Sequence, residues 1–240
     1  MKPGILVALV LAGLPVGCES TGVYAPVLGG ILTDPSGPLT AAEIDAGLRE
    51  ALTVGTGNAA SRLGRENGYF GDPRIRIPLP KAYREVQRNL AVFGASGPLD
   101  DVELRLNRAA EAAVPEARAL ILGAVRSMTI EDALGILRGG DTAATDFLRT
   151  RTEAQLRTAF TPHVKSALSK SGAFTAMENY LTGVGLGGAT TGIQADLTSH
   201  AVTLGLDGMF LYVAEEEKKI RENPVARTTD LLRKVFGASA

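Results

Sequence analysis

The 240-residue chain contains no tryptophan, one cysteine and two histidines, and each scarcity excludes a class of site. A single cysteine allows neither an intramolecular disulfide nor a paired-cysteine zinc motif. The histidines, His163 and His200, lack the spacing of metal ligands, so we expect no metal site. With 5 Tyr and 7 Phe, aromatic surfaces for stacking bases or sugars are scarce. A net charge of −1 gives no basic footprint, so we expect no nucleic-acid partner.

Sequence signatures of cofactor chemistry are also missing. The glycine-rich run at residues 183–188 is not followed by the Lys–Ser or Lys–Thr of a phosphate-binding loop, and it follows no strand-like segment. No serine-centred nucleophile motif occurs. We therefore expect no cofactor and lean against an enzyme, a question that motif absence alone leaves open. The composition, 45% hydrophobic and 21% charged, is that of an ordinary globular protein.

The N-terminus has the pattern of a secretory signal. Lys2 precedes an apolar run at residues 5–14, which is shorter than the about 20 residues that a membrane-spanning helix needs. We therefore predict a signal peptide over residues 1–17 of an exported bacterial protein.

The segment that ends at Cys18 resembles the lipobox of bacterial lipoproteins, in which a small residue such as Gly17 precedes an acylated cysteine. Ordinary cleavage after Ala25 is the alternative, and Pro26 disfavours it. Acylation also removes a lone thiol from an oxidising compartment. Because Glu19 rather than Asp follows the cysteine, we expect an outer-membrane lipoprotein whose folded part faces the periplasm.

The rest of the chain is patterned as an all-α protein. A Gly-, Ser-, Thr- and Pro-rich flexible tether is predicted at residues 18–39, followed by a single helical domain over residues 40–240. Thr40 and Glu43 have the spacing of a capping box, and Thr129 with Asp132 predicts the start of a shorter helix.

One segment departs from helical periodicity. Across residues 72–80, Ile75, Ile77 and Leu79 alternate with Arg and Pro, a period of two that is typical of extended backbone. Three prolines exclude a central strand, and no second strand-like run is present to pair with it. We predict an extended arm that lies across helices with these three apolar side chains inward.

Proline, glycine and capping residues predict where the other helices begin and end. The helix after the arm carries the apolar stripe Tyr83, Val86, Leu90 and Phe93. The expected boundaries are a new helix at Pro115, a cap at Asp141, a break at Pro162, a loop over 183–192, a long helix from Ile193 to about Glu222, and a last helix started by Asn223–Pro224.

Four polar residues lie around the proline junction in alanine-rich surroundings: Asn107, Arg108, Glu111 and Glu116. Small neighbours allow close helix packing, so these groups could form a polar pocket that grips a ligand. The alternative is a structural salt-bridge network, which we favour because buried charges are normally paired.

A second candidate pair is Asp196 and His200, four residues apart on one helix face that continues through Thr203 and Asp207. A carboxylate at this spacing can orient an imidazole for acid–base chemistry or share a metal with it. We favour the plainer interpretation, a solvated stripe on an apolar helix.

The charge run at residues 215–222 offers Glu215–Lys219 and Glu217–Arg221, each with the acid four residues before the base. This order suits an exposed helix. A face that binds a partner is possible in principle, and a solvated face is the favoured interpretation.

Six stretches of this chain together resemble a family of exported bacterial proteins, domain-of-unknown-function family 4197. The likeness covers roughly residues 48–236. The stretches are 77–80 (IPLP), 107–117 (NRAAEAAVPEA), 139–145 (GGDTAAT), 206–210 (LDGMF), 215–221 (EEEKKIR) and 235–236 (VF). The resemblance implies an exported α-helical protein and implies no activity, because the family has none assigned.

Three functions stay open on the sequence. The first is a non-enzymatic protein that binds a protein partner or an apolar ligand within or between its helices. The second is a hydrolase-like enzyme that uses Arg108, Glu111 and Glu116, or Asp196 and His200. The third is a purely structural envelope lipoprotein. The missing nucleophile, metal and cofactor signatures favour the first.

We predict that Cys18 is acylated and holds the protein at a membrane. Palmitate labelling of the wild type and of Cys18→Ser measures this directly. The wild type is expected to incorporate label and to fractionate with membranes, whereas the variant does neither. If both proteins are unlabelled and equally soluble, the lipid anchor is wrong.

Overall fold

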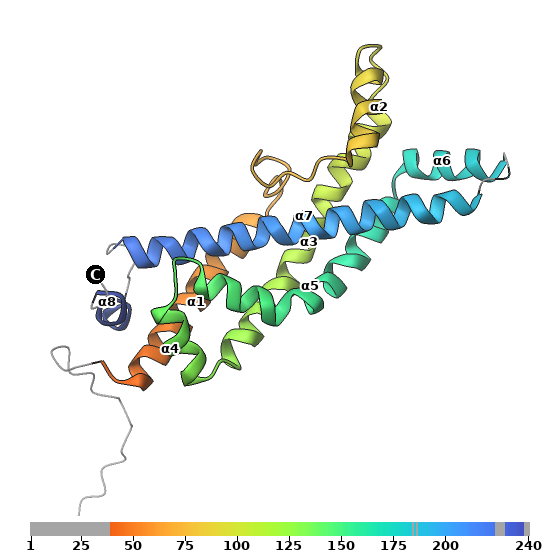
Figure 1. Cartoon of the computed structure of the whole chain (residues 1–240). Helices are drawn as coiled ribbons and strands as arrows, with labels where there is room; N and C mark the ends of the chain where they lie inside the picture. The colour runs from red at the N-terminus through yellow and green to blue at the C-terminus, as the bar shows by residue number, and fades with distance from the viewer. Residues whose placement is uncertain (1–38, 184, 186, 224–228, 238–240) are drawn as a thin grey trace, which may run out of the picture. The chain divides into compact units, whose positions relative to one another are not determined.

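The computed structural model describes residues 39–183, 185, 187–223 and 229–237, all within one compact unit that spans residues 35–240. Its described residues form eight helices and no β-strand, which confirms the all-α prediction (Figure 1). The helices are α1 (Ala41–Leu63), α2 (Lys81–Ala91), α3 (Gly97–Arg126), α4 (Ile130–Arg138), α5 (Ala143–Ser169), α6 (Gly172–Gly183), α7 (Gly187–Glu222) and α8 (Asp230–Gly237). The predicted signal peptide, Cys18 and the start of the last helix at Pro224 lie outside the described residues.

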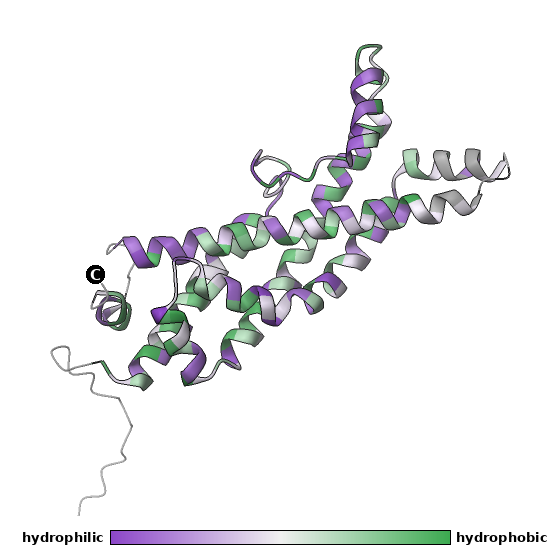
Figure 2. Cartoon of the chain, viewed as in Figure 1, coloured by the Kyte–Doolittle hydropathy of each residue, from purple (hydrophilic) through white to green (hydrophobic). Residues whose placement is uncertain are grey.

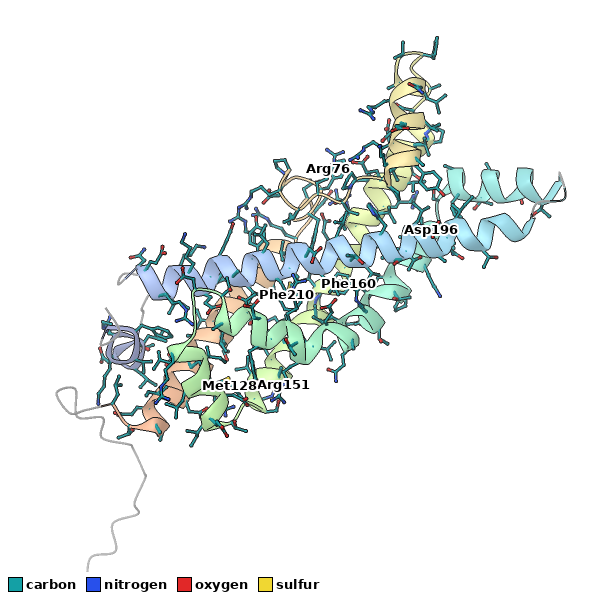
Figure 3. All side chains as sticks on the ribbon, in the orientation of Figure 1. Arg76, Met128, Arg151, Phe160, Asp196 and Phe210 are labelled. Atoms are coloured by element: carbon teal, nitrogen blue, oxygen red, sulfur yellow. The ribbon has the colours of Figure 1, made fainter. Side chains whose placement is uncertain are left out.

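Four long helices build the core. α3 packs along α5, α5 packs along α7, and α1 contacts both α3 and α7. Their facing sides carry the hydrophobic residues, which Figure 2 shows in green. Phe160 of α5 and Phe210 of α7 are both buried in this core (Figure 3). No helix among the described residues is long and apolar enough to cross a membrane.

Both predicted capping patterns are confirmed. The Thr40 side chain accepts a hydrogen bond from the Glu43 backbone, and the Glu43 carboxylate accepts one from the Thr40 backbone, at the start of α1. The Thr129 and Asp132 side chains make the same reciprocal bonds at the start of α4. Local sequence is sufficient here because the partners are three residues apart.

Two of the boundaries predicted from proline, at Pro115 and Pro162, are wrong. Pro115 lies inside α3 and Pro162 lies inside α5. In α3 the buried stripe continues in phase past the proline, through Val114 and Ala117, and Pro115 itself is exposed. Continuous packing against α5 therefore outweighs a helix penalty of about 3 kcal/mol for proline.

The predicted cap at Asp141 is also wrong, because the start of α5 is capped by a residue distant in sequence. Asp141 is exposed, and the N-cap position is occupied by Thr142, whose side chain makes no capping hydrogen bond. Instead the buried Glu217 carboxylate of α7 accepts hydrogen bonds from the backbone N–H groups of Ala144 and Thr145, at 3.0 and 2.9 Å. The Thr145 hydroxyl donates a third, at 2.8 Å.

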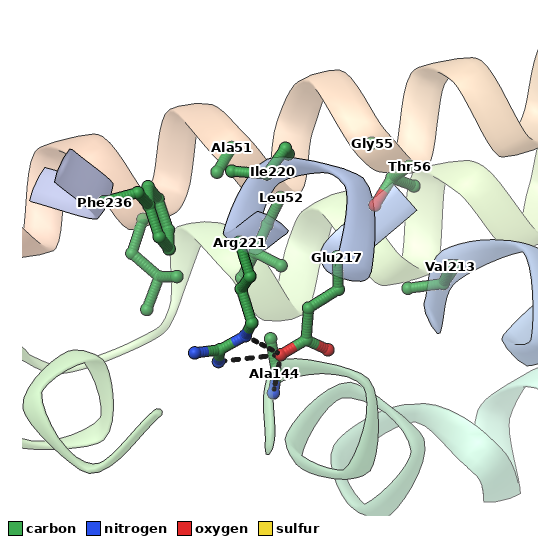
Figure 4. A pocket seen from close by; sticks show the side chains of 11 residues that line it. Ala51, Leu52, Gly55, Thr56, Ala144, Val213, Glu217, Ile220, Arg221 and Phe236 are labelled. Atoms are coloured by element: carbon green, nitrogen blue, oxygen red, sulfur yellow. Dashed lines mark hydrogen bonds and ion pairs between the residues drawn. The ribbon is translucent and has the colours of Figure 1, made fainter. Parts of the chain in front are cut away.

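The predicted glycine-rich loop over 183–192 is much shorter, since α7 begins at Gly187 rather than Ile193. The charge run at the other end of α7 also differs from the solvated face that was expected. Glu217 and Arg221 do pair, at 2.8 Å (Figure 4). However, Glu217 is buried, and Arg221 also donates to the Ile136 carbonyl at the end of α4.

Glu215 and Lys219 do not form the predicted pair. Glu215 binds Arg74, and Lys219 binds Glu216. The reason is again tertiary: residues 72–74 approach α7 next to Glu215 and bring a competing guanidinium. The predicted pair Glu217–Arg221 therefore anchors the α4–α5 corner to α7. The predicted pair Glu215–Lys219 is replaced by the long-range pair Arg74–Glu215.

Glu217→Gln is expected to destabilise the protein by about 3 kcal/mol, because it removes the charge that compensates Arg221 and one acceptor oxygen at a buried helix start. Glu222→Gln is the matched control on the same helix. Its carboxylate is exposed and lies 3.8 Å from Lys218, so a change below about 1 kcal/mol is expected. Urea unfolding of the two variants measures both values, and equal effects would rule out the capping role of Glu217.

Candidate functional site

Residues 64–80, which connect α1 to α2, are the only long non-helical stretch among the described residues, and the arm is their second half. Ile75, Ile77 and Leu79 are 5%, 0% and 1% exposed, which confirms the predicted inward face. The arm begins with a turn, since the backbone N–H of Arg76 donates to the Asp72 carbonyl, so only residues 76–80 are extended.

Asn107, from the predicted polar cluster, binds the backbone of the arm. Its side chain is fully buried on α3. The Asn107 Oδ1 accepts from the Ile77 backbone N–H at 2.9 Å, and its Nδ2 donates to the Ile77 carbonyl at 2.8 Å. One amide side chain thus satisfies both peptide groups of a buried residue that has no strand partner.

Glu111 and Arg108 hold the first half of the connection in the same way. The Glu111 carboxylate is buried and accepts from the backbone N–H groups of Tyr69 and Phe70, at 3.1 and 3.3 Å. Arg108 donates to Glu111 at 2.6 Å and reaches on to Glu66 at 3.0 Å. Asn107, Arg108 and Glu111, three members of the predicted cluster, therefore lie together against the connection. Asn107 and Glu111 bind its backbone, and Arg108 binds Glu111.

Glu116, the fourth member, is not part of that group. It is exposed on the other side of Pro115 and lies 3.1 Å from the Nε2 of His163 on α5. The cluster predicted at residues 107–116 is thus divided by the structure into a backbone-holding set and a surface pair.

The predicted pair on α7 is also separated. The Nε2 of His200 lies 2.8 Å from the Pro78 carbonyl of the arm, so this nitrogen carries a proton and donates. Asp196 is exposed and is not the hydrogen-bond partner of His200 (Figure 3). Further along the stripe, Thr203 and Asp207 bind arginines of α5. The predicted stripe is therefore partly solvated, with Asp196 and Asp207 exposed, and three of its four residues also contact neighbouring elements.

Tyr69 and a glycine of α7 set how closely the connection approaches the core. The fully buried Tyr69 hydroxyl donates to the Gly205 carbonyl at 2.7 Å, and burial raises the pKa of this phenol, so it stays protonated. A Cβ on Gly208 would lie 2.9 Å from the Tyr69 ring and 3.1 Å from Ile75 Cβ. Only glycine permits this approach.

The outer side of the connection forms an open cleft of about 580 Å³ with the end of α1 and with α7. We call it the Arg cleft. Its lining residues are Arg62, Arg65, Asn67, Gly68, Gly71, Asp72, Pro73, Arg74, Tyr212, Glu215 and Lys219.

Four of these residues form a hydrogen-bonded group at the base of the Arg cleft. Arg74 donates to Asp72 at 2.8 Å, to Tyr212 at 2.7 Å and to Glu215 at 2.5 Å. The Tyr212 hydroxyl donates to Asp72 Oδ2, the same oxygen that accepts from Arg74 Nη2. The hydrogen bonds from Arg74 and then Tyr212 hold the pKa of Asp72 well below its usual range, and burial raises the pKa of Tyr212. At neutral pH Asp72 is thus a carboxylate, Tyr212 a phenol and Arg74 a guanidinium.

Further cations surround this base. The Arg62 guanidinium lies 4.7 Å from the centroid of the Tyr212 ring, and Lys219 approaches from α7. Among the described residues, no carboxylate pairs with Arg62 or Arg65, which are both exposed. The cleft therefore presents positive charge that its own acids, Asp72 and Glu215, do not neutralise.

The backbone beside these cations is unusual. Asn67 has a φ of 62°, a left-handed conformation that is uncommon outside glycine. The next residue must be Gly68, because a Cβ there would lie 2.3 Å from the Leu63 carbonyl oxygen. The turn brings Arg65 and Arg74 to the same cleft, and it is held by the Asn67 side chain, which accepts from Arg108 at 2.9 Å.

Sequence reasoning missed the Arg cleft. Arg62, Arg65 and Arg74 were not singled out, because their acceptors and neighbours on α7 are about 140 residues away. The one available signal was Asn67–Gly68 directly after a helix, a pair typical of a turn with left-handed backbone.

A second, apolar cavity lies between α1, α7 and α8. It has a volume of about 20 Å³ and is lined mainly by aliphatic side chains and Phe236, with Glu217 and Arg221 at one side (Figure 4). The buried Thr56 hydroxyl borders this cavity and has no protein hydrogen-bond partner. No group of three His, Cys, Asp or Glu side chains that could hold a metal gathers in the described ranges.

Glu111→Gln is expected to lower the free energy of unfolding by about 1–3 kcal/mol, because the ion pair with Arg108 is lost beside a buried backbone turn. Glu116→Gln is the matched control on the same helix, and its exposed pair with His163 predicts a loss below about 1 kcal/mol. Denaturant titration distinguishes them. A Glu111→Gln protein at least as stable as the wild type would show that this carboxylate is held for a ligand, at a cost to the fold.

Comparison with known proteins adds a family and no activity. No curated protein and no solved structure matches this chain. One family model, described as "Protein of unknown function (DUF4197)", matches residues 38–237. This range contains all of the helices described above. The chain therefore belongs to the DUF4197 family of proteins of unknown function.

Proposed function

We propose that this protein is an exported, non-enzymatic binding protein, held at the outer membrane by an acylated Cys18, and that its Arg cleft takes an anionic group of a ligand or partner. The observation that supports this most is the excess of cations in the cleft. Arg74 is paired with Asp72 and Glu215, and Lys219 with Glu216, whereas Arg62 and Arg65 line the same cleft without a carboxylate partner among the described residues.

Carboxylate and phosphate groups fit these cations. Guanidinium groups bind both through paired, charge-assisted hydrogen bonds. Arg74 is occupied by its own carboxylates, whereas Arg62 and Arg65 lie exposed at the mouth. Arg62 lies in the last turn of α1 and Arg65 two residues after its end, and both line the same cleft, so both can reach one anion.

The state of the polar group at the base supports binding over catalysis. An acid–base catalyst needs a group that exchanges its proton near the working pH. The pKa of Asp72 is shifted down and that of Tyr212 up, so both move away from neutrality. The group is suited to hold the cleft in shape while the arginines above it bind.

The experiment is mass spectrometry of molecules that co-purify with the natively exported full-length protein. The wild type is expected to carry an anionic molecule that Arg62→Gln/Arg65→Gln loses. Arg118→Gln/Arg138→Gln removes the same charge from exposed positions outside the cleft and is expected to retain it. With the molecule in hand, each cleft arginine should account for on the order of a tenfold change in Kd, as expected for a charge-assisted hydrogen bond.

Two results would contradict the proposal. An anion that remains on Arg62→Gln/Arg65→Gln lies elsewhere on the protein. An anion lost equally from the control variant is held by net charge rather than by the cleft.

A further inference from the structure

α2 and the start of α3 form a helical hairpin whose turn is apolar. Residues 90–99, from the end of α2 into the first turn of α3, carry no charged side chain. Figure 1 shows α2 extending away from the long helices, and Figure 2 shows green, hydrophobic residues at the turn after it.

The most exposed large hydrophobic side chains of the described residues are all on this hairpin. Phe93 is 84% exposed, Val92 is 81% exposed and Val86 is 50% exposed. No residue of α2 is buried, although Tyr83, Val86, Leu90 and Phe93 form the apolar stripe read from the sequence. Tyr83 and Leu90 of this stripe are half-buried, whereas Val86 and Phe93 are left in solvent.

α2 packs against α3 through a polar contact instead. The Gln87 side chain donates to Asp100 at 2.7 Å and to Glu103 at 3.1 Å. This contact fixes the hairpin while leaving Val86 and Phe93 to one side of it. The apolar turn is therefore presented by a supported element and not by a loose loop.

The charged face of α2 indicates what the apolar turn meets. Lys81, Arg84 and Arg88 follow one another at spacings of three and four, on the side of the helix opposite Val86 and Leu90. None of the three pairs with a carboxylate of the described residues, and Glu85 is the only acid on α2. A helix with an apolar face, a basic opposite face and little net hydrophobicity is the pattern of segments that lie in the membrane interface.

We propose that the α2–α3 hairpin inserts its turn, Val92 and Phe93 first, into the surface of an anionic phospholipid bilayer. A convex apolar turn needs no complementary groove in a bilayer, which accepts apolar side chains to a depth of about 5–10 Å. Arg88 and Arg84 lie five and nine residues before Phe93, about one and a half and two and a half helical turns, which suits contact with lipid phosphates. This contact depends neither on Cys18 nor on the Arg cleft.

The absence of tryptophan makes a sharp test possible. In the full chain, Phe93→Trp introduces a single tryptophan at the turn, which can be excited selectively over the 5 Tyr. Ile130→Trp introduces one at another exposed apolar position, 48% exposed at the start of α4. The probes are vesicles of phosphatidylethanolamine and phosphatidylglycerol, with and without brominated acyl chains. The fluorophore of Phe93→Trp is expected to shift its emission to shorter wavelength and to be quenched by the brominated lipid, while that of Ile130→Trp changes little.

The readout reports depth at one position, so an acyl anchor that brings the whole chain to the vesicle cannot mimic it. Val92→Ser in the Phe93→Trp background should weaken insertion on the order of tenfold, from the apolar area removed. Equal quenching at both positions, or no change on adding vesicles, overturns the proposal. Emission of Phe93→Trp that is already blue-shifted without lipid also overturns it, because the turn is then covered by protein.

Discussion

Several peptide groups of residues 64–80 are buried without a helix or sheet to satisfy them, and side chains from α3 and α7 are placed to do so. A buried donor or acceptor left without a partner costs about 1–3 kcal/mol. Asn107 serves Ile77, Glu111 serves Tyr69 and Phe70, and His200 serves Pro78. The position of α3 relative to α7 is thus tied to one non-helical segment that lies against both.

The same requirement recurs at the ends of the helices. The Arg49 side chain of α1 donates to the carbonyls of Val125 and Arg126 at the end of α3, at 2.6 and 2.8 Å. The Glu217–Arg221 pair of α7 serves the start of α5 and the end of α4 together. In each case the charge has the sign that the helix dipole favours, negative at a start and positive at an end. Charged residues here stabilise the fold mainly by joining one helix to the end of another.

Contacts within one helical turn could be predicted from the sequence, whereas contacts between distant helices could not. The capping boxes at Thr40 and Thr129 were predictable because both partners lie within one helical turn. The inward face of the arm followed from a period of two. The cap of α5 was not predictable, because Thr142 and Asp141 look like local caps while Glu217 lies more than 70 residues away. Nor were the prolines decisive, since packing across Pro115 and Pro162 keeps both helices continuous.

The polar cluster shows the limit most clearly. Asn107, Arg108 and Glu111 were recognisable as polar groups in crowded, alanine-rich surroundings, and the structural interpretation was favoured on that ground. Their partners are peptide groups of residues 69–77. Every residue has such groups, so the sequence pattern could not predict which ones these side chains bind. The Arg cleft was not predicted for a different reason. Arginines are common surface residues in any sequence, and only the fold places these around one opening.

The stretches that carry the family resemblance are largely those that satisfy the backbone. Residues 77–80, 107–117, 139–145 and 215–221 contain the Ile77, Asn107, Glu111, Thr145 and Glu217 contacts, and 206–210 contains Gly208 against Tyr69. The likeness to the family therefore reflects how the chain folds. Arg62, Arg65 and the turn at residues 92–93 lie outside these stretches, and the described structure gives them no internal partner of opposite charge or apolar cover. Because a side chain already committed to the fold has little capacity left for a ligand, binding is to be sought among the residues that the fold leaves uncommitted.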